Sequence, residues 1–417
     1  MASSTSDWPD GRTLDVLVVG AGPAGSAVAV LLARAGYSVV AVDRAGFPRD
    51  KACSEYMSPE TVRLLDGLGV VEALEAAGAA PLEGTLVTAA HGSRLHGRFA
   101  LAGPPPFRPM GLSVSRRVLD HTLIGAARDA GAVVLERTAV EELVYDRGAV
   151  AGAVLRDDVG GRRVLRARLT VGADGLRSLV ARRVGRRRHG RPRRLAFVAH
   201  VDGVEGMGDS AELHVGRRAY AGLNPIGGGR TNVALVLDAE LARPSRGRAE
   251  GFLLESLRQF PGVYQRVARG TLARPVLATG PFAAWSGRVV ADGAALVGDA
   301  ADFFDPFTGE GICSAIRGAM LLAHTADQAL AAGARPHGPV SARSLRGYPR
   351  ARRTAFAGKW AIERLIGYGM LFPGLFDRAV ARLGRRAGMA DTLIGVTGDF
   401  VPARRVLNPV FLARMIL

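Results

Sequence analysis

The chain of 417 residues is 48% hydrophobic and 22% charged, which excludes a disordered protein and predicts one large or two interleaved domains. Its two cysteines, Cys53 and Cys313, are too few for a disulfide framework, so we expect a reducing, cytoplasmic setting. The formal net charge of +17 comes almost wholly from arginine, without the aromatic interleaving or recognition element of a nucleic-acid binder, so we expect no nucleic-acid partner.

No targeting or membrane-spanning segment is expected at the N-terminus. Residues 1–11 are polar and carry no basic region, and the first apolar run, Leu14–Val19, has only the length of a strand. A signal peptide needs a basic region before a longer apolar stretch, and a spanning helix needs about 20 apolar residues.

The first elements predict a dinucleotide-binding unit. The β-branched run Leu14–Val19 is typical of a buried parallel strand, an apolar helix follows and ends near Gly36, and a second strand, Ser38–Val42, ends at Asp43. The turn between the first strand and the helix reads Gly20-Ala-Gly22-Pro-Ala24-Gly25.

Each residue type in this turn has a physical role. Gly20 permits the tight turn, Gly22 lets the backbone approach a pyrophosphate, and Gly25 lets the helix pack on the strand; Ala24 lies between them. The phosphates then lie at a helix N-terminus, where free N–H groups favour negative charge. Asp43 is placed to bond the ribose hydroxyls, so these residues are predicted to bind an adenine dinucleotide.

Helices and strands alternate over the next hundred residues. We expect a helix ending near Leu68, a helix over Arg116–Gly131, and strands at Val133–Leu135 and over Leu143–Leu155. The densest basic run, Arg182–Arg194, is interrupted by glycine and proline and is predicted to be a loop. This loop is either a solvated surface or a landing site for an anionic partner, such as NADPH phosphate, an acidic lipid or an acidic carrier protein.

From Leu195 the hydrophobic period changes to two, which predicts an antiparallel sheet. The alternating segments are Leu195–Val201, Ala211–Val215, Tyr220–Asn224 and Thr231–Val236. A buried strand returns at Ala294–Val297, and helical sequence follows almost to the end. The dinucleotide domain is therefore predicted to be interrupted by the sheet.

Two later segments carry a family resemblance. Gly172-Ala-Asp174-Gly175, with Ser178 and Arg182, resembles the "DG" motif of the para-hydroxybenzoate hydroxylase-like (group A) flavoproteins. Leu296-Val-Gly298-Asp299-Ala-Ala, continuing to Asp305-Pro306 and Gly309-Glu310-Gly311-Ile312, resembles their "GD" motif. The order and spacing are similar along roughly the whole chain. The resemblance implies one bound FAD, with NAD(P)H as a transient reductant.

The resemblance also implies roles for individual residues. Asp174 and Asp299 belong to the two motifs, and Asp299 would accept a bond from a ribityl hydroxyl. Gly311 and Ile312 open a helix whose N–H groups would face the flavin ring, with Gly309 just before them. Two arginines complete the predicted FAD site: Arg116 near the phosphates and Arg44 beside the adenine.

Within the family, the sequence is similar to the branch of geranylgeranyl reductases and flavin-dependent halogenases. The segments Phe47-Pro-Arg49-Asp-Lys51-Ala-Cys53 and Pro306-Phe-Thr-Gly-Glu-Gly-Ile312 carry this similarity. The reductases' YxWxFP-like strand is altered here to Tyr220-Ala-Gly222-Leu-Asn224-Pro225, and the two halogenase tryptophans are missing. Period-two geometry puts Tyr220, Gly222 and Asn224 on one face, which predicts a wider, more polar cavity.

Three side chains are assigned as catalytic candidates: Cys53, Tyr220 and Asn224. The Cys53 thiol would donate a proton near the flavin, with help from Glu55, or it is an inert buried hydrophobe. His200 and His214 either reach the substrate or are satisfied within the sheet. No metal site is expected.

The C-terminal region mixes arginine with apolar residues between Trp360 and Leu417, interrupted by Pro373-Gly374. It is predicted to be either a helical cap over the active site or a basic, apolar face that touches a membrane or admits a lipophilic substrate. The location expected is therefore cytoplasmic, with peripheral contact at the inner membrane face as the alternative.

The predicted fold is α/β, with a Rossmann-type FAD-binding domain, an inserted antiparallel-sheet substrate domain and a helical C-terminal region. The FAD-binding domain is assigned to residues 1–80, 105–190 and 275–345, the sheet domain to 81–104 and 191–274, and the helical region to 346–417.

The function expected is an NAD(P)H-dependent monooxygenase of secondary metabolism, a hydroxylase or epoxidase that acts on a lipophilic aromatic, polyketide or isoprenoid substrate. The alternatives are a geranylgeranyl-reductase-like ene-reductase of isoprenoid double bonds, and a non-enzymatic flavoprotein that binds a carrier protein or a membrane.

Overall fold

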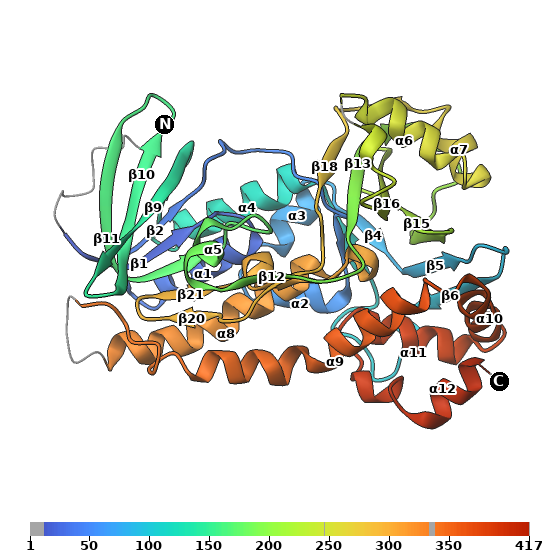
Figure 1. Ribbon diagram of the computed structural model, residues 1–417. Coiled ribbons are helices and arrows are strands. Elements are labelled where there is room, and N and C mark those ends of the chain that lie inside the picture. Colours follow the sequence, from blue (N-terminus) through green and yellow to red (C-terminus); the bar gives the residue numbers. More distant parts are fainter. Residues whose placement is uncertain (1–11, 246, 333–337, 417) are drawn as a thin grey trace.

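The computed structural model describes residues 12–245, 247–332 and 338–416. The predicted polar N-terminal stretch 1–11 and Leu417 lie outside these residues. The described chain forms two large sheets side by side, each with its own helices, and helices of the last third of the chain lie beneath both (Figure 1). This is the α/β arrangement that the sequence predicts.

The first sheet is the Rossmann-type sheet. Its strand order is β20-β21-β11-β1-β2-β8, parallel apart from the short edge strand β20. The antiparallel strands β9 and β10 extend β11. The bounds are β1 (Leu14–Val19), β2 (Val39–Val42), β8 (Val133–Leu135), β9 (Thr138–Asp146), β10 (Ala149–Asp157), β11 (Arg162–Gly172), β20 (Val290–Ala291) and β21 (Ala294–Leu296).

Helices cover both faces of this sheet. The bounds are α1 (Pro23–Arg34), α2 (Pro59–Asp66), α3 (Val71–Ala76), α4 (Arg116–Asp129), α5 (Leu179–Val184) and α8 (Gly311–Ala331). Helix α1 packs against α4 and α8, and most of its side chains are buried, because its sequence is apolar all round rather than amphipathic. A second core lies on the opposite face, under α5 and the β9–β10 hairpin.

The second sheet is inserted between segments of the first. Its order is β17-β13-β16-β15-β14-β5-β6, with β18 also on β13. The bounds are β5 (Gly84–Thr88), β6 (Arg94–Arg98), β13 (Arg194–Asp202), β14 (Ser210–Val215), β15 (Ala219–Pro225), β16 (Arg230–Asp238), β17 (Thr271–Leu272) and β18 (Leu277–Thr279). Two details differ from the prediction: β14 and β5 pair in parallel, and β18 lies beyond the boundary at residue 274.

The connecting segments form smaller elements. One three-stranded sheet has the order β12 (Arg187–His189), β19 (Ala284–Ser286) and β22 (Asp302–Phe303), and another the order β3 (Tyr56–Met57), β7 (Gly111–Ser113) and β4 (Ala80–Leu82). The 3-10 turns are η1 (Phe99–Leu101), η2 (Arg243–Ser245), η3 (Gly298–Ala300), η4 (Pro306–Thr308) and η5 (Ala403–Arg405).

Helices close both faces of the second sheet. The bounds are α6 (Ala249–Leu257), α7 (Pro261–Val267), α9 (Gly347–Gly369), α10 (Pro373–Gly384), α11 (Ala387–Thr397) and α12 (Pro409–Ile416). Helices α6 and α7 cover one face, and α10 and α11 pack against β6 at the other, near the C-terminus (Figure 1). Among the described residues, no helix combines the length and the apolar character needed to cross a bilayer.

Candidate functional site

Three glycine motifs lie against one another at the carboxyl ends of the Rossmann strands. In chain order, the first is Gly20–Gly25, the second Gly172–Gly175 and the third Leu296–Ile312. A methyl group added to Gly20 would lie 2.6 Å from the oxygen of Ala173 and 2.8 Å from the Cα of Asp174. A methyl group on Gly298 would lie 3.0 Å from the Cβ of Ala24. The first and second motifs therefore touch through backbone, and the third packs on the helix that the first one opens.

The two remaining glycines of the first turn have different surroundings. A Cβ on Gly25 would lie 1.8 Å from the oxygen of Gly20, so only glycine allows the helix to pack there. A Cβ on Gly22 would meet nothing closer than the Nη2 atoms of Arg116 and Arg49, each at 3.7 Å. The backbone of Gly22 thus faces two guanidinium groups, with room for a Cβ between them.

Three basic side chains, Arg49, Lys51 and Arg116, lie together beside Gly22 and Gly175. Lys51 Nζ would lie 3.7 Å from a Cβ on Gly175, and burial, followed by the nearby charge of Arg116, lowers the pKa of Lys51. The buried Nε of Arg49 has no hydrogen-bond partner. Positive charges that lie close together beside a helix N-terminus repel one another unless an anion binds between them. A diphosphate group would supply this negative charge and would accept a hydrogen bond from the unpaired donor. Arg49, Lys51 and Arg116 would hold the phosphates of FAD.

Asp120 on α4 holds two of these arginines. Arg116, which is 4% exposed, donates from Nε and Nη2 to the two carboxylate oxygens of Asp120 at 2.7 and 2.8 Å. Arg49 Nη1 lies 3.0 Å from the same carboxylate. Arg116 was predicted for this site; Arg49 and Lys51 were not assigned roles, although they belong to the segment that carries the branch resemblance.

Asp43 lies at the end of β2, as predicted for a ribose-binding acid. Its carboxylate accepts hydrogen bonds from the N–H groups of Ala21 at 3.0 Å and Ala45 at 2.9 Å, and Arg49 Nη2 lies 3.5 Å away. Asp43 therefore fixes the glycine turn directly. Arg44, predicted to flank the adenine, is exposed beside it.

Asp174 and Asp299 are the acids of the two later motifs. Asp174 accepts from the N–H of Leu179 at 2.6 Å, while its other, buried oxygen has no partner, and burial raises its pKa. Asp299 lies in the turn η3, and burial raises its pKa against the opposing charges of Lys51 and Arg116. Both carboxyl groups have the capacity to accept hydrogen bonds from a polyhydroxylated ligand.

Arg187 is a positioning residue that the sequence did not reveal. The basic run Arg182–Arg194 is not simply a loop, because it ends α5 and contains β12. From β12, Arg187 donates to the carbonyls of Leu176 at 3.1 Å, Asp299 at 3.0 Å and Ala300 at 2.9 Å. It thereby ties the second motif to the third, and nothing in the sequence distinguishes it from its arginine neighbours.

The third motif ends at the N-terminus of α8. Gly309 has φ +73°, and a Cβ there would lie 2.7 Å from the ring of Tyr56, so glycine is required. The helix begins at Gly311 as predicted, with Ile312 buried after it. Between the two glycines, burial raises the pKa of Glu310 to about 7. The first N–H groups of α8 are available to an electron-rich group.

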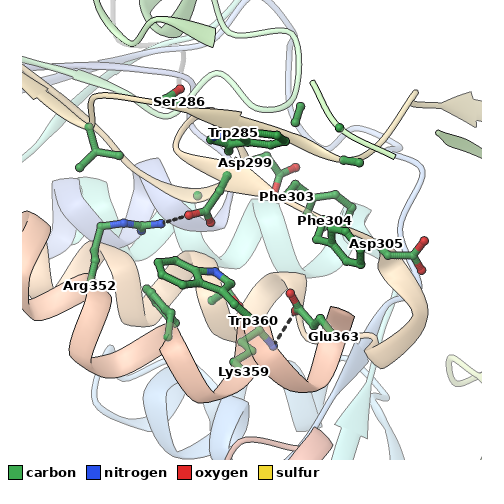
Figure 2. Close-up of a pocket in the computed structure, with 18 of the residues that line it drawn as sticks. Trp285, Ser286, Asp299, Phe303, Phe304, Asp305, Arg352, Lys359, Trp360 and Glu363 are labelled. Atoms are coloured by element: carbon green, nitrogen blue, oxygen red, sulfur yellow. Dashed lines mark hydrogen bonds and ion pairs between the residues drawn. The ribbon is translucent and has the colours of Figure 1, made fainter. Parts of the chain in front are cut away.

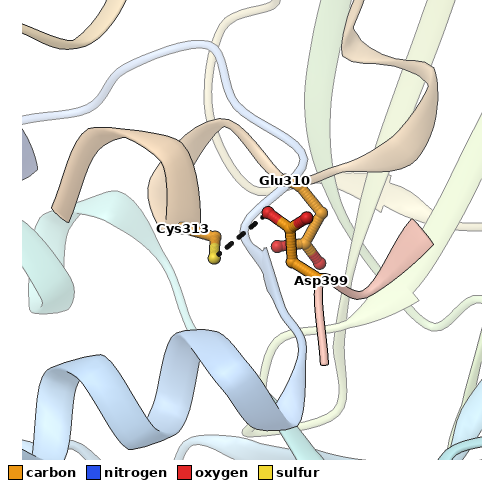
Figure 3. A group of neighbouring side chains, drawn as sticks. All are labelled: Glu310, Cys313 and Asp399. Carbon is orange, nitrogen blue, oxygen red and sulfur yellow. Dashed lines mark hydrogen bonds between the residues drawn. The ribbon is translucent and has the colours of Figure 1, made fainter. Parts of the chain in front are cut away.

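Glu310, Cys313 and Asp399 bring three potential metal ligands together (Figure 3). Asp399, however, already lies 3.2 Å from Nη1 of Arg317 and 3.6 Å from Nζ of Lys359. Burial also raises the pKa of the Cys313 thiol well above its usual value, so the thiolate needed for a metal is disfavoured. The donor set does not fit a metal ion, and we assign the cluster as a buried ion-pair network.

A cavity of about 570 Å³ lies between α9 and the β12–β19–β22 sheet. Asp299 and Gly311 line it, which connects it to the third motif. Figure 2 shows Trp360 on α9 facing the strand that carries Trp285. Arg352 pairs with Asp302 at 2.6 Å and Lys359 with Glu363 at 3.4 Å, and Arg353 and Arg364 add positive charge to the α9 side of the wall. The aromatic lining consists of Trp285, Phe303, Phe304, Phe356, Trp360 and Tyr368.

Tyr220 and Asn224 do not line this cavity. The buried Tyr220 hydroxyl donates to Asp305 Oδ1 at 2.7 Å, and Asn224 Nδ2 donates to Ser113 Oγ at 2.5 Å. Asp305 also pairs with Arg194 at 2.8 Å. The Tyr220 hydroxyl and the Asn224 Nδ2 group are thus engaged within the protein, and the catalytic role of both residues stays a prediction.

Cys53 lies in a turn that is fixed from three sides. The N–H of Glu55 donates to Cys53 Sγ at 3.3 Å, and Glu55 has φ +62°, a strained conformation for a non-glycine residue. One carboxylate oxygen of Glu55 accepts from the N–H of Arg116 at 2.8 Å, and the other lies 2.8 Å from His200 Nε2. Asn232 Nδ2 donates to the Cys53 carbonyl at 2.9 Å.

This network places the Cys53 thiol between the three basic side chains and the second sheet. His200 and Glu55 are 3% and 1% exposed, so their contact is shielded from water. His200 is therefore satisfied within the protein, as is His214, which pairs with Glu212 at 2.9 Å. Cys53 as a residue is half-buried, and its thiol contacts the N–H of Glu55 and the side chain of Arg116.

Replacing His200 with alanine should loosen the turn and expose Cys53. Loss of a buried hydrogen bond worth about 1.5 kcal/mol corresponds to a roughly tenfold change in an opening equilibrium. We expect a thiol reagent to modify Cys53 about tenfold faster in His200→Ala, because Cys313 is fully buried and does not compete. His214→Ala removes the same kind of pair from the same sheet and should leave the rate unchanged. Equal rates in both variants would contradict the network.

Comparison with known proteins agrees with this geometry. The family described as "FAD binding domain" matches residues 13–215. The chain is 33% identical to the menaquinone reductase of Mycolicibacterium smegmatis over 317 residues, which cover 72% of each chain. It is 27% identical to digeranylgeranylglycerophospholipid reductase 1 of Methanococcoides burtonii, over 84% of this chain and 82% of that one.

Solved structures share the fold. The myxobacterial chondrochloren halogenase, an FAD-dependent enzyme, matches with a TM-score of 0.78 and 23% identity over 86% of this chain and 83% of its own. A geranylgeranyl bacteriochlorophyll reductase-like protein from Thermoplasma acidophilum matches with a TM-score of 0.77 and 22% identity over 93% of this chain and 95% of its own.

Proposed function

Because the chain belongs to the para-hydroxybenzoate hydroxylase-like (group A) family of FAD-dependent oxidoreductases, in the branch of geranylgeranyl reductases and flavin halogenases, we propose that it is an ene-reductase. Its substrate is a membrane lipid that carries a polyprenyl chain, and it saturates a carbon–carbon double bond of that chain.

The observation that carries this proposal is similarity along most of the chain to two reductases named for polyprenyl lipids. Menaquinone is a naphthoquinone with a polyprenyl tail, and a digeranylgeranylglycerophospholipid carries two geranylgeranyl chains. The alignments cover 72% and 84% of this chain, so they extend well beyond the FAD-binding motifs. The shared part of the two substrates is the unsaturated chain, and we assign recognition to that part.

FAD, once reduced, would supply a hydride for addition to one carbon of the double bond. The protein's own residues do the rest. Arg49, Lys51 and Arg116 hold the diphosphate, and the N-terminus of α8 faces the flavin ring. The second carbon takes a proton from water, so that two hydrogens add across the bond. The thiol of Cys53, like Tyr220 and Asn224, does not line the cavity, and its proton-donor role stays a prediction. NAD(P)H is the proposed source of the two electrons.

The cavity beside the third motif supports an apolar substrate. Its volume of about 570 Å³ lies within the usual range for small-molecule sites, and aromatic rings make up much of its wall. A hydrocarbon chain would lie along these rings, while Arg191, Arg353 and Arg364 in the same lining could hold a polar headgroup.

Oxygenation is the competing outcome, because the altered strand at Tyr220–Asn224 favours a monooxygenase over a reductase on sequence grounds. The experiment is to incubate the FAD-loaded protein in air with NADPH and a menaquinone that carries four prenyl units. The molecular mass of the quinone is then measured after complete reoxidation. A gain of two hydrogens that survives reoxidation supports chain reduction. A gain of one oxygen atom, or a gain of two hydrogens that is lost on reoxidation and so lay in the ring, would overturn it.

A further inference from the structure

An exposed apolar corner joins the end of α9 to the start of α10. Five large apolar side chains within eleven residues of this corner, on the last turns of α9, the connection and the first turn of α10, are 40–63% exposed. They are Leu365, Tyr368, Leu371, Phe372 and Leu375. Large apolar side chains grouped in this way on a protein surface mark an interaction site.

The charge around the corner is almost entirely positive. Residues 364–386 contain five arginines and a single acidic residue, Asp377. Asp377 is itself occupied, because its carboxylate accepts hydrogen bonds from the N–H of His91 at 3.1 Å and from Ser93 Oγ at 2.9 Å. Exposed arginines therefore flank the apolar side chains without acidic neighbours to neutralise them.

The arginine-rich segment Arg182–Arg194 adds to this charge. The hydroxyl of Tyr368 on the corner donates to the carbonyl of Arg191 at 3.3 Å, so the two segments lie side by side. Arg188, Arg191 and Arg193 are all exposed here. Two features that are distant in the sequence, one basic and one apolar, thus form one surface.

This surface also borders the cavity described above. Arg191, Arg364 and Tyr368 belong both to the surface and to the cavity lining. An apolar ligand would pass from the corner into the cavity along aromatic side chains.

We propose that the α9–α10 corner docks on an anionic lipid bilayer, with its apolar side chains in the interfacial region and its arginines among the headgroups. Interfacial binding of this kind grows with buried apolar area and with the attraction of basic residues to acidic lipids. Docking there would let a polyprenyl chain move from the bilayer into the cavity without crossing water. Only this delivery route rests on the proposed function; the docking itself does not.

The test is co-sedimentation of the FAD-loaded protein with vesicles of phosphatidylcholine alone or with 30% phosphatidylglycerol, without substrate. We expect binding to the anionic vesicles, weakened at least tenfold in Leu371→Ser/Phe372→Ser and weakened by salt. Leu101→Ser/Phe107→Ser is the matched control, because these side chains are 62% and 54% exposed elsewhere on the molecule, and it should bind as the wild type does.

The proposal is overturned if the wild type does not bind anionic vesicles, or if both double variants bind equally. Neither result decides whether the protein is a reductase. That is tested separately by product mass, with a lipid dispersed in detergent, so no bilayer is needed.

Discussion

Replacing Gly22 with valine should weaken FAD binding by roughly 100-fold or more while leaving the fold intact. A Cβ at this position would meet no protein atom closer than 3.7 Å, and its nearest neighbours are the flexible ends of two arginines, which can move aside for the Cγ atoms of valine in the apoprotein. It would, however, fill the space between the helix N-terminus and the guanidinium groups of Arg49 and Arg116, where the diphosphate is expected. A loss of this size corresponds to about 3 kcal/mol of binding free energy.

Gly25→Val is the matched variant with the opposite expectation. Its Cβ would lie 1.8 Å from a backbone oxygen, so the helix is displaced and the fold itself is damaged. Flavin titration and thermal unfolding of both apoproteins separate the two effects. If Gly22→Val binds FAD as tightly as the wild type does, the first glycine motif is not part of the FAD-binding site.

Replacing Asp305 with alanine should lower the free energy of unfolding by about 3 kcal/mol, the lower end of the usual effect of breaking a buried ion pair, because Arg194 keeps a longer contact with Asp238 at 3.6 Å. Asp305 and Arg194 are each 3% exposed in their side chains and lie 2.8 Å apart, and Tyr220 donates to the same carboxylate. The pair connects β13 of the second sheet to the loop of the third motif, so the loss is expected to loosen the flavin-facing loop as well.

Urea unfolding measures this effect. The control is Glu240→Ala, which breaks the pair of Arg218 with Glu240 at 3.0 Å, where both side chains are exposed to water. That variant should unfold at the urea concentration of the wild type, because exposed pairs contribute little. Similar unfolding midpoints for the Asp305 and Glu240 variants would show that the buried Asp305 contact stabilises the fold no more than an exposed ion pair does.

Most of the fold could be predicted because it depends on local pattern. The first strand, Leu14–Val19, has the predicted bounds, since a continuous β-branched run between a polar stretch and a glycine turn has few alternatives. The four alternating segments after Leu195 are strands within two residues of the predicted bounds. The parallel pairing of β14 with β5 could not be predicted, because period-two alternation is the same in both pairings.

The site could be predicted only where a motif marks it. Glycine turns identify the neighbourhood of Asp43, Asp174 and Asp299, because each turn requires a residue type that few other structures need. Arg187 is different: its three carbonyl partners come from segments more than a hundred residues apart in the chain, and no spacing rule reaches that far. The contact of Glu55 with His200 was missed for the same reason.

A single turnover without oxygen shows directly whether the reduced flavin saturates a double bond of the lipid. The FAD-loaded protein is reduced with one equivalent of dithionite, mixed anaerobically with a polyprenyl lipid, and followed by flavin absorbance and product mass. We expect the oxidised flavin spectrum to return while one double bond per flavin is saturated. A flavin that stays reduced until air is admitted, with unchanged lipid before that moment, would contradict it.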